Sequence, residues 1–157
     1  MFTYEVYIGN NTQDTFDTSI SKSNFEDICR VFKTKYNYTQ VKQKYYYTQG
    51  NIFYNTQGEL FIKEYISEEI KTISKRSVFI AKVNITKLDP IEFNNSLNYI
   101  LEHDIYMYDF SVNNNIKIKC CQNDSTSYYI KLEIKTDINT SIKLVNEIID
   151  IIYKFHK

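Results

Sequence analysis

Charged side chains alternate with apolar ones along the segment 127–136. Lys131, Glu133 and Lys135 occupy every second position, and the intervening positions are apolar (Tyr128, Ile130, Leu132 and Ile134). This period of two predicts a strand. Flanking helices would cover its apolar face, so we expect the charged row to point the other way, into the interior of the domain. An inward row of lysines would bind anions, whereas an outward row would only protect sheet edges and solubility. The pattern by itself leaves both interpretations open.

Composition limits the classes of function. The 157 residues carry 19 basic and 19 acidic side chains, a balance that argues against a dedicated non-specific DNA-binding protein. The aromatic content of 16% provides enough apolar material for a core and excludes disorder. The preference for Lys over Arg, with abundant Ile, Asn and Tyr, indicates an AT-rich genome such as that of a virus, protist or bacterium.

The three cysteines and the hydropathy pattern bear on location. Cys29 lies on the apolar stripe of an expected helix, and Cys120 and Cys121 are adjacent. An odd number of cysteines with an adjacent pair is a poor disulfide framework, which favours a reducing, cytoplasmic setting. The absence of a Cys-x-x-Cys motif argues against a structural zinc site. No apolar run approaches the ~18 residues of a membrane span, and the N-terminus resembles native domain rather than a signal peptide.

The order of expected elements predicts a single α+β domain over residues 1–157 with three helices flanking an antiparallel sheet. Ser21 or Ser23 would cap the first helix, and Asp89, Pro90 and Glu92 form a typical start for the second. In chain order we expect a strand at 3–8, a helix at 21–35, strands at 42–48, 52–54, 60–67, 69–74 and 77–86, a helix at 89–102, strands at 105–112, 116–121 and 127–136, and a helix at 139–155.

This order resembles the CYTH or triphosphate-tunnel family, and is closest in pattern to the metal-dependent RNA triphosphatases of fungal and viral mRNA-capping enzymes. The resemblance rests on Glu5 in the first strand and on the segments 60–64, 115–119 and 128–135. It implies an antiparallel β-barrel of about eight strands that encloses a tunnel.

The resemblance also implies roles for individual side chains. Glu5 and Glu133 would be the catalytic residues and would hold Mg²⁺ or Mn²⁺. A ring of lysines would bind the phosphates: Lys63, Lys71, Lys82, Lys117, Lys119 and Lys131. Active members of the family carry more glutamates, whereas Lys131 and Lys135 occupy positions where acids are expected. The sequence therefore predicts a degenerate tunnel that binds a phosphorylated ligand, such as a triphosphorylated RNA or a nucleotide.

Other interpretations of the same residues remain. Glu5 and Glu133 would be solvated surface acids if they faced outward, or would form internal ion pairs with lysines. The domain would be a non-catalytic structural or protein-interaction module, for example a viral accessory protein, if its interior were dry and lined by Tyr and Ile. A helix-grip domain that binds an apolar ligand is disfavoured by the expected helix at 89–102.

Two further patterns have both a functional and a plain structural interpretation. Lys42 and Lys44 beside Tyr45, Tyr46 and Tyr47 fit base stacking in nucleic-acid binding, but also a Tyr-rich strand. His103 and His156 are expected at helix ends, where a cation interacts favourably with the helix dipole.

Overall fold

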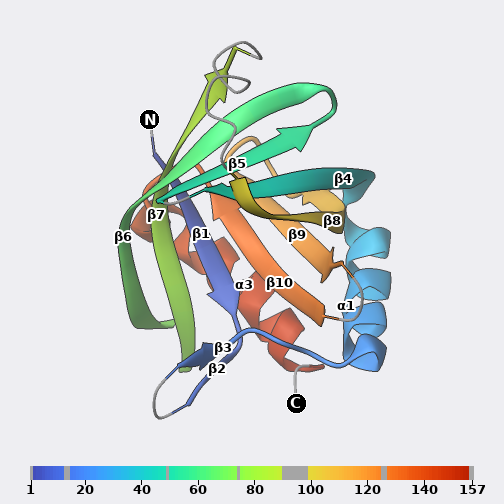
Figure 1. Ribbon diagram of the computed structural model, residues 1–157. Helices are drawn as coiled ribbons and strands as arrows, with labels where there is room; N and C mark the ends of the chain where they lie inside the picture. The colour runs from blue at the N-terminus through green and yellow to red at the C-terminus, as the bar shows by residue number, and fades with distance from the viewer. Residues whose placement is uncertain are drawn as a thin grey trace.

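Figure 1 shows the computed structural model of the chain. It describes all residues except 1, 13–14, 49, 74, 90–98, 125–126 and 156–157, and it describes only the backbone of residues 99–100.

Eight strands of the described chain form a closed barrel in which all neighbours are antiparallel. The order around the barrel is β1-β10-β9-β8-β4-β5-β6-β7, and β1 closes it by pairing with both β10 and β7. This arrangement confirms the predicted antiparallel barrel and excludes the helix-grip alternative. The strands are β1 (Thr3–Ile8), β4 (Asn37–Thr48), β5 (Asn51–Thr56), β6 (Glu59–Ile73), β7 (Arg76–Leu88), β8 (Tyr99–Ser111), β9 (Ile116–Asn123) and β10 (Ser127–Ile134).

Smaller elements connect the barrel to its helices. The short strands β2 (Asn10–Asn11) and β3 (Phe16–Asp17) pair with each other after β1. Helix α1 (Lys22–Lys35) is capped by Ser21, one of the two caps that the sequence offered, whose Oγ accepts a hydrogen bond from the Asn24 backbone N–H at 3.1 Å. A short 3-10 helix, η1 (Ile138–Ser141), leads into helix α3 (Ile142–Tyr153). No helix within the described ranges has the length and apolar character to cross a membrane.

The main hydrophobic core lies outside the barrel wall, between the outer face of the barrel and the two helices. In Figure 1, α3 lies against the side of the barrel formed by β1 and β10, and α1 lies beside β9. The apolar face of β10, with Ile130, Leu132 and Ile134, packs in one core cluster with Ile148 and Ile149 of α3. The predicted assignment of that face to helix packing is confirmed, which leaves the charged positions of β10 facing inward.

Strand β6 is one long strand, although its sequence predicts two strands at 60–67 and 69–74. A bulge between Tyr65 and Ser67 adds one residue to β6 opposite β7. The extra residue shifts the alternation of side chains by one, so that the inward positions are odd-numbered before the bulge and even-numbered after it. The period of two is therefore broken in the middle of a continuous strand.

The helix expected at 89–102 is wrong over its last residues, because β8 begins at Tyr99. Residues 90–98 lie outside the described residues. The helix-start pattern at Asp89 is a local signal, whereas β8 is specified by its pairing with the distant strand β4, in which His103 lies opposite Tyr45. His103 is thus a strand residue rather than a helix end, and His156 lies outside the described residues.

Candidate anion-binding tunnel

Glu5 and Glu133 face each other across neighbouring strands inside the barrel. In the pairing of β1 with β10, Glu5 lies directly opposite Glu133, and in the pairing of β10 with β9, Lys131 lies opposite Lys119. Directly paired residues point to the same side of a sheet. Because the alternate residues of β10 are buried in the outer core, these four side chains project into the tunnel. For Lys131 and Glu133 this inward placement was expected from the alternation along β10, whereas for Glu5 and Lys119 it was implied only by the family resemblance.

Glu5 is completely buried and makes charge-assisted hydrogen bonds with two lysines. Its Oε2 accepts hydrogen bonds from Lys63 Nζ and from Lys131 Nζ, each at 2.8 Å. Its Oε1 accepts a third hydrogen bond, at 3.1 Å, from the hydroxyl of Tyr7. Lys63 comes from β6, so the pair with Glu5 spans β7 and ties two non-adjacent strands across the interior.

A second set of ion pairs continues from Glu5 toward β9 and β8. Lys119 Nζ lies 2.9 Å from Glu133 Oε2, and Lys131 Nζ lies 4.0 Å from the same oxygen. Farther along, Lys117 Nζ is 3.7 Å from Asp109 Oδ2. Lys131 thus contacts both glutamates and joins them, with Lys63 and Lys119, into one ionic network, and the Lys117–Asp109 pair lies beside that network.

The network keeps its acids ionised. Burial opposes ionisation of Glu5, but Lys131 and Lys63 outweigh burial and hold the pKa of its carboxyl well below the ordinary value. Burial likewise opposes ionisation of Glu133, and Lys119 and Lys131 still lower its pKa. Both carboxylates are therefore charged at neutral pH.

The buried lysines differ from one another. Burial lowers the pKa of Lys131, yet Glu5 reverses this effect and the net pKa is well above the ordinary value. Lys119 is also raised, because Glu133 outweighs its burial. The pKa of Lys63 is lowered by its burial and by the neighbouring charge of Lys131. Of these three lysines, Lys63 therefore has the lowest pKa.

Of the six lysines predicted to bind phosphate, the structure brings Lys63, Lys119 and Lys131 together in the network. Lys117 lies beside it, opposite Glu133, in a separate pair with Asp109. The structure does not bring Lys71 and Lys82 to them. Lys82 pairs with Tyr4 on the outer face of the barrel, and its Nζ lies 4.2 Å from the ring centroid of Phe2.

Lys71 and Lys135 show where the alternation of side chains failed to predict orientation. Lys71 is exposed beyond the β6 bulge, which reverses the alternation that would otherwise have pointed it inward. Lys135, expected in the inward row, lies past the end of β10 and is exposed.

The opposite wall of the tunnel is aromatic and was not predicted as part of the site. Tyr45 and Tyr54, on β4 and β5, stack at 5.3 Å between ring centroids, and Tyr54 stacks on Phe61 of β6 at the same distance. The Nζ of Lys63 lies 5.7 Å and 5.6 Å from the centroids of Tyr45 and Tyr54. The aromatic wall therefore contacts the ionic network through Lys63. The run of three tyrosines at 45–47 was the available signal, but it shows no contrast between the two faces of the strand.

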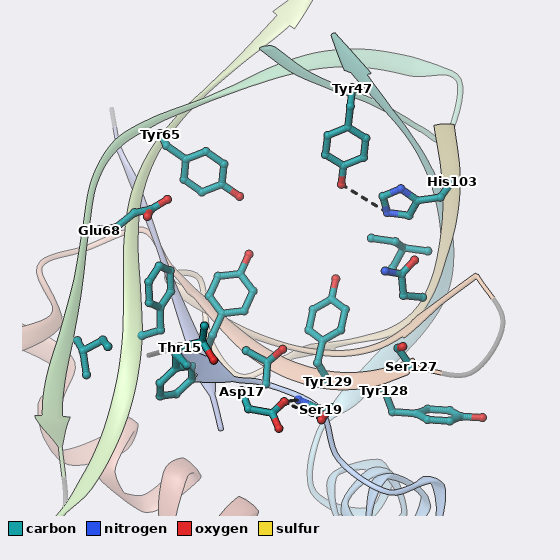
Figure 2. A pocket seen from close by; sticks show the side chains of 17 residues that line it. Thr15, Asp17, Ser19, Tyr47, Tyr65, Glu68, His103, Ser127, Tyr128 and Tyr129 are labelled. Carbon is teal, nitrogen blue, oxygen red and sulfur yellow. Dashed lines mark hydrogen bonds between the residues drawn. The ribbon is translucent and has the colours of Figure 1, made fainter. Parts of the chain in front are cut away.

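A cavity of about 730 Å³ opens at one end of this wall. Figure 2 shows Tyr47, Tyr65, Tyr129 and His103 pointing into it from different strands, with the Tyr47 hydroxyl 3.5 Å from His103 Nε2. Tyr7 also lines the cavity, and its hydroxyl binds Glu5. Tyr7 thus connects the lining of the cavity to the ionic network.

The acids of the tunnel do not suit a divalent cation, which requires several oxygen ligands free of competing cations. Glu5 Oε2 already accepts hydrogen bonds from two ammonium groups, and Glu133 Oε2 accepts one from Lys119. Within the described residues, no three His, Cys, Asp or Glu side chains are grouped as metal ligands. The alternative of internal ion pairs with lysines is the arrangement that these two glutamates adopt.

Known structures share this barrel. The triphosphatase of the mimivirus capping enzyme has a TM-score of 0.62 at 15% identity, over 97% of this chain and 89% of that one. The Pct1 RNA triphosphatase of S. pombe has a TM-score of 0.67 at 10% identity, over 99% and 84% of the two chains. The chain has the triphosphate-tunnel fold.

The triphosphate-tunnel fold extends to archaeal proteins. The PH1819 protein of Pyrococcus horikoshii matches 98% of this chain and 89% of its own, with a TM-score of 0.58 and 12% identity. These findings confirm the resemblance predicted from the sequence at the level of fold. The sequence itself matches no protein-family model and no curated protein.

Proposed function

We propose that the tunnel binds the polyphosphate group of a phosphorylated ligand on its interior lysines. The observation that supports this most directly is the grouping of three nearly buried ammonium groups, on Lys63, Lys119 and Lys131, in one interior network. Buried lysines are rare because desolvating their charge is costly. They provide three cations for the two acids of the network, Glu5 and Glu133.

In this proposal the acids are counterions that keep the lysines charged and in place before the ligand arrives. Glu5 positions Lys63 and Lys131, and Glu133 positions Lys119, at hydrogen-bonding distances. Ammonium groups bind phosphate oxygens through charge-assisted hydrogen bonds. Structural neighbours named as RNA triphosphatases support a 5′-triphosphate, on RNA or on a nucleotide, as the ligand group.

We further propose that binding does not depend on a metal ion and that hydrolysis of the γ-phosphate has been lost. Metal-assisted phosphoryl transfer requires a cation that bridges phosphate oxygens and is held by free carboxylates. Here the two glutamates expected to hold it are engaged by lysines. The protein would then be a phosphate-binding relative of triphosphatases rather than an active one.

Calorimetric titration with inorganic tripolyphosphate in EDTA tests the binding site. We expect the wild type to bind, and Lys119→Gln to weaken binding by about tenfold or more, as for loss of a hydrogen bond to a charged group. Lys82→Gln is the matched control, because Lys82 lies on the outer face of the barrel, and we expect it to bind as the wild type does. Absence of wild-type binding, or equal losses in both variants, would favour the protein-interaction alternative.

Release of phosphate from tripolyphosphate, ATP and 5′-triphosphorylated RNA tests the proposed loss of catalysis. With Mg²⁺ or Mn²⁺ present, we expect no release above the level without protein. Release that disappears in Glu5→Gln would show that the tunnel is an active triphosphatase despite its ion-paired acids.

A further inference from the structure

We propose that the aromatic cavity at the mouth of the tunnel is a binding site for a nucleobase, so that the ligand is a nucleotide or an RNA end rather than inorganic polyphosphate. This inference rests on the proposed function, because it assumes that the phosphates of the same ligand occupy the lysines.

The cavity contains a stack of flat rings of the kind that binds bases. Tyr47 and His103 stack at 5.1 Å between ring centroids with an interplanar angle of 12°. His103 also stacks on Tyr45 at 5.6 Å and 12°. Successive bases stack on such aromatic side chains because every base has a π-face. Tyr47 and His103 line the cavity, whereas Tyr45 is buried behind them.

Tyrosines from two other strands complete the cavity. In Figure 2, the side chains of Tyr65 from β6 and Tyr129 from β10 point into the space that Tyr47 and His103 also face. A volume of about 730 Å³ falls in the range of small-molecule sites, which are mostly apolar with a few polar groups. The space is therefore suited to a planar ring system bounded by aromatic faces and hydroxyl groups.

The charges of the cavity favour a base over a phosphate. Its lining includes the acids Asp17 and Glu68, and none of the described residues that line it is Lys or Arg. Burial raises the pKa of Tyr47 to about 12, so its hydroxyl stays neutral. Phosphate would be repelled here, whereas an uncharged base would not.

The cavity and the lysines are adjacent. Tyr7 lines the cavity, its hydroxyl binds Glu5, and its ring centroid lies 5.7 Å from Lys131 Nζ. Tyr65 and Tyr47 also line a second cavity, of about 460 Å³, and Lys63 is part of the lining of that cavity. A nucleotide with its base against Tyr47 would direct its phosphates past Tyr7 toward Lys131 and Lys63.

The test compares the affinities of ATP and inorganic tripolyphosphate, measured by calorimetry in EDTA. ATP has the same triphosphate but less charge, so any advantage over tripolyphosphate must come from the nucleoside. We expect ATP to bind the wild type at least about tenfold more tightly, the magnitude of one base stacked on an aromatic ring. Tyr47→Leu should reduce the ratio of the two affinities to near one, and Tyr47→Phe should preserve it.

Tyr106→Leu is the matched control, because Tyr106 is exposed on the outer face of the neighbouring strand β8. It should leave the ratio unchanged. Equal wild-type affinities for the two ligands, or an ATP advantage that survives in Tyr47→Leu, would overturn the base site while leaving the phosphate site intact. Failure of tripolyphosphate to bind would instead contradict the proposed function. The wild-type ratio decides the matter even if Tyr47→Leu does not fold.

Discussion

The tunnel has an ionic wall on β1, β10 and β9, which carries Glu5, Lys131, Glu133 and Lys119, and an aromatic wall on β4, β5 and β6. What covers the outer faces of these strands explains the difference between the two walls. The outer residues of β1 and β10 belong to the core beneath α1 and α3, with Val6, Ile8, Ile130 and Leu132 fully buried. These strands are stabilised from outside and can therefore carry buried charges inside. Strand β4 exposes polar outer residues such as Gln40 and Lys42, so its apolar burial has to come from Tyr45 in the interior. In β10 and β4, helix cover thus decides which face is apolar.

The largest expected effect comes from breaking the ionic wall at Glu5. Glu5→Gln leaves Lys63 and Lys131 close together in the interior without their counterion. We expect a loss of about 3–5 kcal/mol in the free energy of unfolding, as for removing one partner of a buried ion pair. Chemical denaturation measures it. Glu59→Gln is the control, because its pair with Lys87 is exposed and should contribute less than about 1 kcal/mol. Similar losses in both variants would contradict the role given to Glu5.

Acid should destabilise the ionic wall next. The folded-state pKa of Glu5 is below its ordinary value of 4.5, so the unfolded state binds more protons as the pH falls through that value. The contribution of Glu5 is complete above pH 4.5 and is lost as the pH falls toward its folded-state pKa. Denaturation midpoints between pH 7 and pH 3 measure this. We expect a shallower decline in Glu5→Gln, and equal slopes would show that Glu5 is not the group involved.

A smaller effect is expected in the aromatic wall. Tyr45→Phe keeps the stacked ring but removes the hydroxyl that donates to Gln43 Oε1 at 3.0 Å in the interior. We expect a loss of about 1 kcal/mol in the free energy of unfolding, with tripolyphosphate affinity unchanged. Thermal and chemical denaturation give the first value and calorimetry the second. A loss of affinity would place Tyr45 with the phosphate site instead.

The smallest effect is expected on the outer face. Lys82→Gln removes the cation–π contact with Phe2, which should change the free energy of unfolding by about 1 kcal/mol or less. A larger loss in chemical denaturation would show that the outer lysines also stabilise the barrel.

The inward face of β10 could be predicted from the sequence, whereas the aromatic wall could not. On β10, Lys131 and Glu133 alternate with a fully apolar set, and that contrast identifies the inward face. On β4, tyrosines occur on both faces, so Tyr45 and Tyr47 are not distinguished from Tyr46 by periodicity.

Other features depended on pairing between distant segments, which local patterns do not report. The bulge that points Lys71 outward and the pairing of β8 with β4 that places His103 in the cavity are both of this kind. The same limit applies to the ion pair between Glu5 and Lys63, which join non-adjacent strands.

The central claim is that the tunnel's lysines bind polyphosphate while its acids serve as counterions and not as metal ligands. Diffraction from crystals soaked in tripolyphosphate and Mn²⁺ tests it directly, because manganese is located by its anomalous signal. We predict polyphosphate density within hydrogen-bonding distance of Lys119 and Lys131, and no manganese peak at Glu5 or Glu133. A manganese ion coordinated by both glutamates, with their lysine contacts broken, would contradict the account and indicate a metal-dependent triphosphatase.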